Sequence, residues 1–325
     1  MSKPPFIQNL TLPVVAAPMF LISGPQLVIE CCKNGIVGTF PALNQRTSEG
    51  FEEWLIEIKT ALAHFEKETG KKAAPFGVNL IVHNTNPRVQ ADLELCVKHK
   101  VPLIITSLGA VSELVNAVHS YGGLVFHDII KRRHAEKAAE AGVDGLILVS
   151  AGAGGHAGTI NPMPLVAEIK RFFKKTILLA GTISTGRDIA SALQMGADLA
   201  YMGTRFINTQ ESKAPKEYRD MIINAGADDI VYTAAISGVA ANFLGPSIKA
   251  MGITEEMLTR EKKVDFGEEL TVHKDDAKAW ATIWSAGQGV TNIQNAPHVS
   301  ELVVELKSEF ISAIKEQTKY LEIYK

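Results

Sequence analysis

Short apolar runs alternate with longer amphipathic stretches along the first two thirds of the chain. The runs have the length and bulk of strands that are buried on both faces. Between the runs, apolar positions recur every three to four residues, as in helices with one buried face. The pattern predicts eight strands, at 14–20, 36–40, 76–82, from 103, from 124, from 145, at 177–180 and at 199–202.

Helix start and stop signals support this pattern. A long helix is expected to begin at Ser48 and to end at Gly70, and glycines 122 and 142 stand where helix C-caps belong. Alternation of strands and helices without hairpin signals predicts a parallel sheet. Eight such units predict an α/β protein with a closed (β/α)8 TIM barrel, and a doubly wound open sheet is the alternative because periodicity does not show closure.

The pattern changes after residue 226. Residues 227–279 are polar, include a charged run at 259–269, and contain no strand of comparable strength. We therefore expect three parts. A barrel takes residues 1–226, a smaller, mostly helical lid takes 227–279, and a return segment with a C-terminal helix, at 280–325, packs on the barrel.

Composition narrows the function classes. The 325 residues are 46% hydrophobic and 21% charged, which is typical of globular proteins. The net charge of −2 gives no field that would attract nucleic acid or an anionic membrane. No apolar run approaches the length of a membrane span, the start lacks the apolar core of a signal peptide, and the three cysteines form no disulfide framework. We expect a cytoplasmic protein without nucleic-acid or membrane partners, and the histidine spacing predicts no metal site.

The most informative stretch is residues 144–162. A buried strand ends at Ser150 and is followed by five small residues, and His156 is the functional side chain in this clearing. Glycine permits positive φ and close approach of a ligand to the main chain, and histidine titrates near neutral pH. The glycines also fit a loose dinucleotide-binding pattern. We reject that interpretation because they lie in mid-chain and the next strand ends in Ala180-Gly181, with no acidic residue.

Barrel active sites are built at the carboxyl ends of the strands. The strand ends are Pro18-Met19, Pro41, Asn79, Ser107, His127-Asp128, Ser150–His156, Gly181-Thr182 and Gly203-Thr204. The last two pairs follow strands seven and eight, where barrels often hold a phosphate. This predicts a phosphate-bearing cofactor with a flat ring. His127 and Asp128 could form a proton relay, but the favoured interpretation is that Asp128 caps a helix and His127 lines the barrel.

An ordered set of short motifs carries a family resemblance. AAPM, GVNL, AGGHAG, AGTIS, MGTRF and WSAGQG, spread over about residues 14–292, resemble the nitronate monooxygenase family, once called 2-nitropropane dioxygenases. The resemblance implies FMN in a TIM barrel, a helical lid, and oxidation of alkyl nitronates by O2 to a carbonyl compound and nitrite. FMN-dependent NAD(P)H:quinone reductases and enoyl-ACP reductases on the same scaffold are the alternative activity. A non-catalytic barrel that binds a phosphate ligand is a third possibility.

The resemblance also implies roles for residues. His156 matches the active-site histidine and is expected to act as the base. The implied flavin-binding residues are Ala17, Pro18, Met19, Asn79, Ser150, Gly154, Gly155, Gly181, Thr182, Gly203 and Thr204. Weaker candidates for the substrate pocket are His127, Trp284, Ser285 and Gln288. A nitronate and O2 are the expected small-molecule partners, and a homodimer is a compatible assembly.

The chain departs from the family pattern at two positions. Many relatives carry Gln or Glu seven residues before the histidine, and often Glu four residues before it. This chain has Val149 and Gly152 there. A side-chain contact to the flavin ring is therefore missing or taken over by Ser150, and the substrate and subclass stay open.

Overall fold

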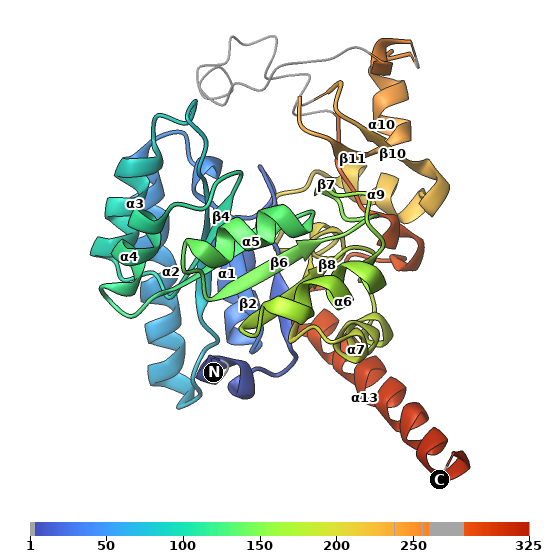
Figure 1. Ribbon diagram of the computed structural model, residues 1–325, viewed down its shortest axis with the longest axis horizontal. Helices are drawn as coiled ribbons and strands as arrows, with labels where there is room; N and C mark the ends of the chain where they lie inside the picture. Colours follow the sequence, from blue (N-terminus) through green and yellow to red (C-terminus); the bar gives the residue numbers. More distant parts are fainter. Residues whose placement is uncertain (1–3, 237, 255, 260–282, 325) are drawn as a thin grey trace.

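The computed structural model describes residues 4–236, 238–254, 256–259 and 283–324. Eight parallel strands close into a barrel in the order β1-β2-β3-β4-β5-β6-β8-β9 (Figure 1). Their bounds are β1 (Val14–Ala16), β2 (Val37–Pro41), β3 (Phe76–Ile81), β4 (Leu103–Ser107), β5 (Leu124–Ile129), β6 (Gly145–Val149), β8 (Thr176–Ala180) and β9 (Leu199–Met202). The predicted TIM barrel is confirmed, and the pairing of β1 with β9 excludes the open sheet.

Helices surround the barrel. The α-helices are α1 (Pro25–Lys33), α2 (Ser48–Thr69), α3 (Val89–Lys98), α4 (Ser112–His119), α5 (Arg132–Glu140), α6 (Pro162–Phe172), α7 (Gly186–Met195), α8 (Thr204–Ile207), α9 (Lys216–Asn224), α10 (Gly245–Ala250) and α13 (Val299–Ile323). The short 3-10 helices are η1 (Pro5–Asn9), η2 (Ala42–Asn44), η3 (Ala227–Asp229), η4 (Met257–Thr259) and η5 (Gln288–Asn292). None of the described helices is both long and apolar enough to cross a membrane.

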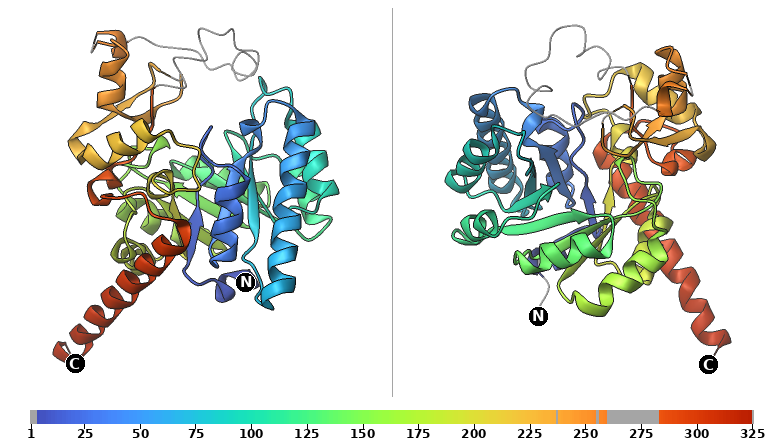
Figure 2. Two further views of the ribbon diagram at one scale, coloured as in Figure 1. Left: turned by 180° about the vertical axis from the view of Figure 1, so that it is seen from behind. Right: turned by 45° about the horizontal axis from the view of Figure 1, so that its top comes forward.

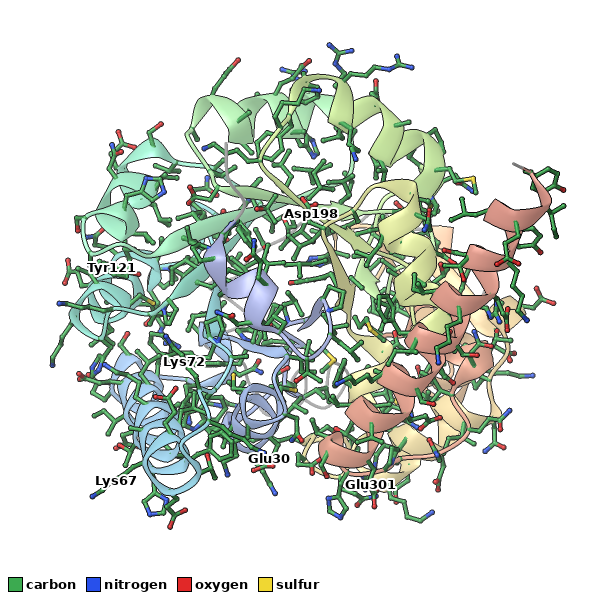
Figure 3. All side chains as sticks on the ribbon, turned by 90° about the horizontal axis from the view of Figure 1, so that it is seen from below. Glu30, Lys67, Lys72, Tyr121, Asp198 and Glu301 are labelled. Carbon is green, nitrogen blue, oxygen red and sulfur yellow. The ribbon has the colours of Figure 1, made fainter. Side chains whose placement is uncertain are left out.

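The apolar core has two layers. One fills the barrel interior and includes Val15, Ile105 and Phe126, while a larger one lies between the strands and the helices. At the amino ends of the strands, Phe6 and Ile7 of η1 pack against the interior layer. Seen from below, the helices ring the strands, η1 lies near the centre, and α13 runs along the outer edge (Figure 3). With the amino end covered by η1, the carboxyl ends are left for a site.

A second, three-stranded sheet contains β7 (Gly155–His156), β10 (Ile230–Thr233) and β11 (Ala241–Leu244) in the antiparallel order β10-β11-β7. It lies above the barrel beside α10 (Figure 1). The sequence predicted mostly helix for 227–279, but the described part of that range contains both β10 and β11. The charged residues at 260–269 and the rest of the expected lid to 279 lie outside the described residues. The three-part division of the chain stays a prediction.

The C-terminal helix α13 packs along α7 and extends past the body of the molecule (Figure 2). The contact is close because Gly186, at the start of α7, faces the backbone of α13. A side chain at position 186 would collide with the Leu306 carbonyl. The N–H of Gly186 also donates to Glu309 Oε2 at 2.6 Å. These contacts hold α13 against α7.

Candidate active site at the barrel mouth

The loop after β6 and the return segment meet backbone to backbone. A Cβ atom at Gly154 would lie 2.8 Å from Gly287 N, and one at Gly287 would lie 2.5 Å from Gly152 O. The Gly287 N–H donates to Thr204 Oγ1 at 2.9 Å, and the Gln288 N–H donates to Gly152 O at 2.9 Å. Glycines 154 and 287 are therefore required by chain packing, whatever they contribute to ligand binding.

The loop after β8 has the backbone freedom expected of a binding loop. Gly181 has φ +127° and Thr182 has φ +60°, a left-handed value that is uncommon for threonine. Ser150 is fully buried, and its hydroxyl donates to Ala180 O at 2.7 Å, so it joins β6 to the end of β8. The buried Ser184 hydroxyl has no hydrogen-bond partner among the described residues.

The ends of β1 and β9 form an open corner. A Cβ atom at Gly203 would lie 3.7 Å from Ala17 Cβ and 3.9 Å from Met19 Sδ, which is ordinary van der Waals contact. The turn after β1 is held in place because Asn44 Nδ2 donates to Met19 O at 3.0 Å. Pro18 lies in this turn and is half-buried. The structure thus brings the predicted residues of strand ends one and eight together.

A polar chain crosses the ends of β3, β4 and β5. Asn79 Nδ2 donates to Ser107 Oγ at 2.8 Å, and the Ser107 hydroxyl donates to Asp128 Oδ2 at 2.6 Å. Burial raises the pKa of Asp128 from 3.8 to about 6, against the effect of the hydrogen bonds from Ser107 and the Leu108 N–H. Asn79 was predicted as a site residue, whereas the role of Asp128 in this chain was missed.

The sequence interpretation had His127 and Asp128 the wrong way round. His127 lies on the outer face of β5, where its Nδ1 is 2.8 Å from Thr106 Oγ1. Burial, with a contribution from His134, lowers its pKa to about 4. Asp128 lies on the inner face with Phe126, and the N-terminus of α5 has no side-chain cap. Because β5 is apolar on both faces, strand periodicity does not indicate which neighbour points inward.

His156 lies on β7, opposite Ala241 of β11. Its side chain is exposed, and none of the described residues hydrogen-bonds its ring. Desolvation nevertheless lowers its pKa below 6.5. Both properties fit a ring that is open to solvent on one side and surrounded by protein on the others. Gly155, with φ +68°, has open space where a side chain would start.

The weaker candidates separate into two groups. Gln288 is exposed, and its Oε1 lies 2.7 Å from the place that a Cβ at Gly152 would take, beside Thr182. Trp284 instead stacks on Tyr218, with ring centroids 4.9 Å apart, and the Tyr218 hydroxyl donates to Ser285 O. Gln288 therefore joins the loops at the barrel mouth, whereas the Trp284 ring packs against α9.

Comparison with known proteins decides the family. A profile described as nitronate monooxygenase matches residues 84–309, well over half of the chain. The chain belongs to the nitronate monooxygenase family. A nitronate monooxygenase of Paraburkholderia phytofirmans is 26% identical over 95% of this chain and 94% of that protein. An octahydroindene-carboxyl-CoA dehydrogenase of Rhodococcus jostii is 27% identical over 73% of this chain. The chain spans only 63% of the length of that dehydrogenase and 44% of a monooxygenase of Mycobacterium tuberculosis.

Solved structures share the whole architecture. FabK from Thermotoga maritima matches with a TM-score of 0.79 at 23% identity, covering 97% of each chain. Nitroalkane oxidase from Streptomyces ansochromogenes matches with a TM-score of 0.81 at 23% identity, covering 95% of this chain and 99% of that one. At this level of identity, both matches show the barrel fold alone.

The nitronate monooxygenase family consists of flavin-dependent oxidoreductases, so the residues at the barrel mouth can be tested for a flavin. Two observations fit one. In the loop after β8, the buried Ser184 hydroxyl has no hydrogen-bond partner within the part of the chain that the structure describes, and the corner at Gly203 has room that a side chain would fill. The expected contact of the Ser150 side chain with the flavin ring is not supported. Ser150 is fully buried and its hydroxyl already donates to Ala180 O, so its side chain cannot replace the missing Gln or Glu.

Proposed function

We propose that this chain is an FMN-dependent nitronate monooxygenase that oxidises alkyl nitronates with O2 to a carbonyl compound and nitrite. The observation that supports this most is the placement of His156. An imidazole without a hydrogen-bond partner among the described residues lies on β7, next to the open position at Gly155. Membership of the nitronate monooxygenase family supports the same chemistry.

The proposed FMN site combines the loops after β8 and β9. Gly181, Thr182 and Ser184 would hold the phosphate, and the corner of Ala17, Met19 and Gly203 would border the flavin. Only one phosphate-binding region is expected, which favours FMN over FAD. Bound FMN would supply the redox chemistry that couples oxidation of the substrate to reduction of O2.

His156 is proposed to act as a general base. A neutral nitroalkane must lose its α-proton before it can give up electrons, whereas a nitronate has already lost it. Desolvation lowers the pKa of His156, so the imidazole is neutral at pH 7.5 and one ring nitrogen can accept that proton. A positioned base of this kind typically contributes about 10²–10⁴-fold to the rate.

The test compares two substrates in the wild type and in His156→Asn. We expect the variant to keep FMN, to lose at least about 10²-fold on a neutral nitroalkane, and to lose much less on the matching nitronate at pH 7.5. In the wild type, activity on the neutral nitroalkane should fall as the pH drops through the histidine pKa. Equal losses on both substrates would overturn the base assignment.

A second candidate is a flavin-dependent dehydrogenase or reductase. The similarity to the CoA dehydrogenase of Rhodococcus jostii favours it. Anaerobic mixing of the yellow protein with a nitronate, with NADH or with an acyl-CoA separates the candidates. Bleaching of the flavin by the nitronate within the mixing time supports the monooxygenase, and faster, saturable bleaching by NADH or the acyl-CoA supports the second candidate.

A further inference from the structure

Asp128 is a half-buried titratable group that the proposed mechanism does not use. It lies at the end of a hydrogen-bond chain that begins at Asn79, one of the predicted flavin-binding residues. The chain runs from Asn79 Nδ2 to Ser107 Oγ, 2.8 Å, and from the Ser107 hydroxyl to Asp128 Oδ2, 2.6 Å. Asn79 Nδ2 also donates to Ile105 O at 3.3 Å. Both hydrogen bonds that Asn79 Nδ2 donates therefore go to acceptors on β4.

The direction of this chain follows from the charge of its last member. An ionised carboxylate can only accept hydrogen bonds, and a serine hydroxyl has one hydrogen to donate. While Asp128 is ionised, Ser107 must donate to it, so Ser107 can only accept from Asn79. The Asn79 amide is then fixed with its oxygen, Oδ1, turned away from the pair of bonds on β4.

Protonation of Asp128 removes this constraint. A protonated carboxyl can donate to Ser107 Oγ, and the Ser107 hydrogen is then free to bond to an amide oxygen. The two orientations of the Asn79 amide, with Nδ2 or with Oδ1 toward Ser107, become closer in free energy. Only the longer hydrogen bond from Nδ2 to Ile105 O still favours the orientation with Nδ2 toward Ser107.

The surroundings of Asp128 allow it to titrate in a useful range. From the β4 side, the Ser107 hydroxyl and the Leu108 N–H donate hydrogen bonds to Asp128. On β9, the negative charge of Asp128 contributes to raising the pKa of Tyr201. Leu108 has φ +63°, a left-handed value for a leucine. On β6, Val149 faces the same barrel interior. Burial, the largest cause, raises the pKa of the carboxyl to about 6.

We propose that Asp128 is a positioning residue that sets, through Ser107, which end of the Asn79 amide faces the barrel mouth. In its ionised form it presents Oδ1 as an acceptor to a flavin at that mouth, and in its protonated form it allows the amide to turn. The second half of this proposal rests on the proposed FMN site, whereas the relay from Asp128 to Asn79 does not.

The relay is tested on the full chain labelled with ¹⁵N-asparagine. The side-chain amide signal of Asn79, assigned by its loss in Asn79→Asp, is followed by NMR from pH 4.5 to 8. We expect it to shift with a midpoint near pH 6 in the wild type and in Ser107→Thr, which keeps the hydroxyl. The shift should disappear in Ser107→Ala and Asp128→Asn. An unchanged shift in Ser107→Ala, or no shift in the wild type, would overturn the relay.

The contact with the flavin is tested separately by the absorbance spectrum of bound FMN over the same pH range. We expect a spectral change with the same midpoint in the wild type and none in Asp128→Asn. A titrating amide beside a pH-independent flavin spectrum would refute the positioning role. A titrating amide in a protein that binds no FMN would support the relay and refute the proposed cofactor.

Discussion

Replacing Asp128 by Asn should stabilise the protein at pH 7.5 and do so less at pH 5. The asparagine oxygen can still accept the hydrogen bonds from Ser107 and Leu108, so the change mainly removes a charge. Burial raises the pKa of Asp128 from 3.8 to about 6, so the folded state holds the proton more tightly than the unfolded chain does. The stability of the wild type therefore falls as the pH rises through this interval.

The magnitude follows from the same two pKa values. At 1.36 kcal/mol per pKa unit, the buried carboxylate costs about 3 kcal/mol at pH 7.5, and about half of this at pH 5. Asp128 is partly exposed, so solvent screening makes this figure an upper bound. Urea unfolding of wild type and variant at both pH values measures the difference.

The control is Asp228→Asn, which changes an exposed aspartate outside the barrel. Its effect on the free energy of unfolding should be small and the same at pH 5 and pH 7.5. If Asp128→Asn destabilises the protein more at pH 7.5 than at pH 5, the carboxylate is stabilised in the fold and the reasoning from burial is wrong.

Three further predictions concern the loops at the barrel mouth. Gly287→Ala places a Cβ against backbone atoms of Gly152 and Gly154, so we expect a loss of about 1–3 kcal/mol in urea unfolding, whereas Gly203→Ala should cost little stability yet weaken FMN binding in a fluorescence titration. A neutral result for Gly287→Ala would mean that the two segments separate easily. Thr204→Val removes the acceptor of the buried Gly287 N–H and should cost about 1–3 kcal/mol, while Thr204→Ser, which keeps the hydroxyl, should cost less.

The barrel could be predicted from the sequence because each of its units carries a strong local signal. The strands are buried on both faces and read as continuous apolar runs. Several helix ends are marked by glycine, and Gly70, Gly122 and Gly142 all have the positive φ of a helix C-cap. The count of eight strand–helix units was enough to predict that the barrel closes, and the pairing of β1 with β9 confirms this closure.

The second sheet could not be predicted because its strands carry no periodic pattern of their own. β7 has only two residues, Gly155 and His156, and its strand conformation depends on pairing with β11, more than 80 residues later. The contact between the loop after β6 and the return segment could not be predicted from the sequence for a related reason. The contact of Gly154 with Gly287 is made by backbone atoms, and no side-chain pattern records it.

The pairing of β7 with β11 has a consequence for the order in which the protein matures. A nascent chain that has left the ribosome only as far as Met202 already contains all eight barrel strands, but the strand that pairs with His156 has not yet been made. Synthesis must continue through Leu244 before β11 is complete, and through Gly287 before the loop ahead of the histidine meets its neighbour. The strands of the barrel are thus synthesised before the strand that pairs with the histidine. A chain cut after β9 would contain every barrel strand but would lose the partner of its histidine, together with Val299, Leu302 and Leu306 of α13, which belong to the larger core layer.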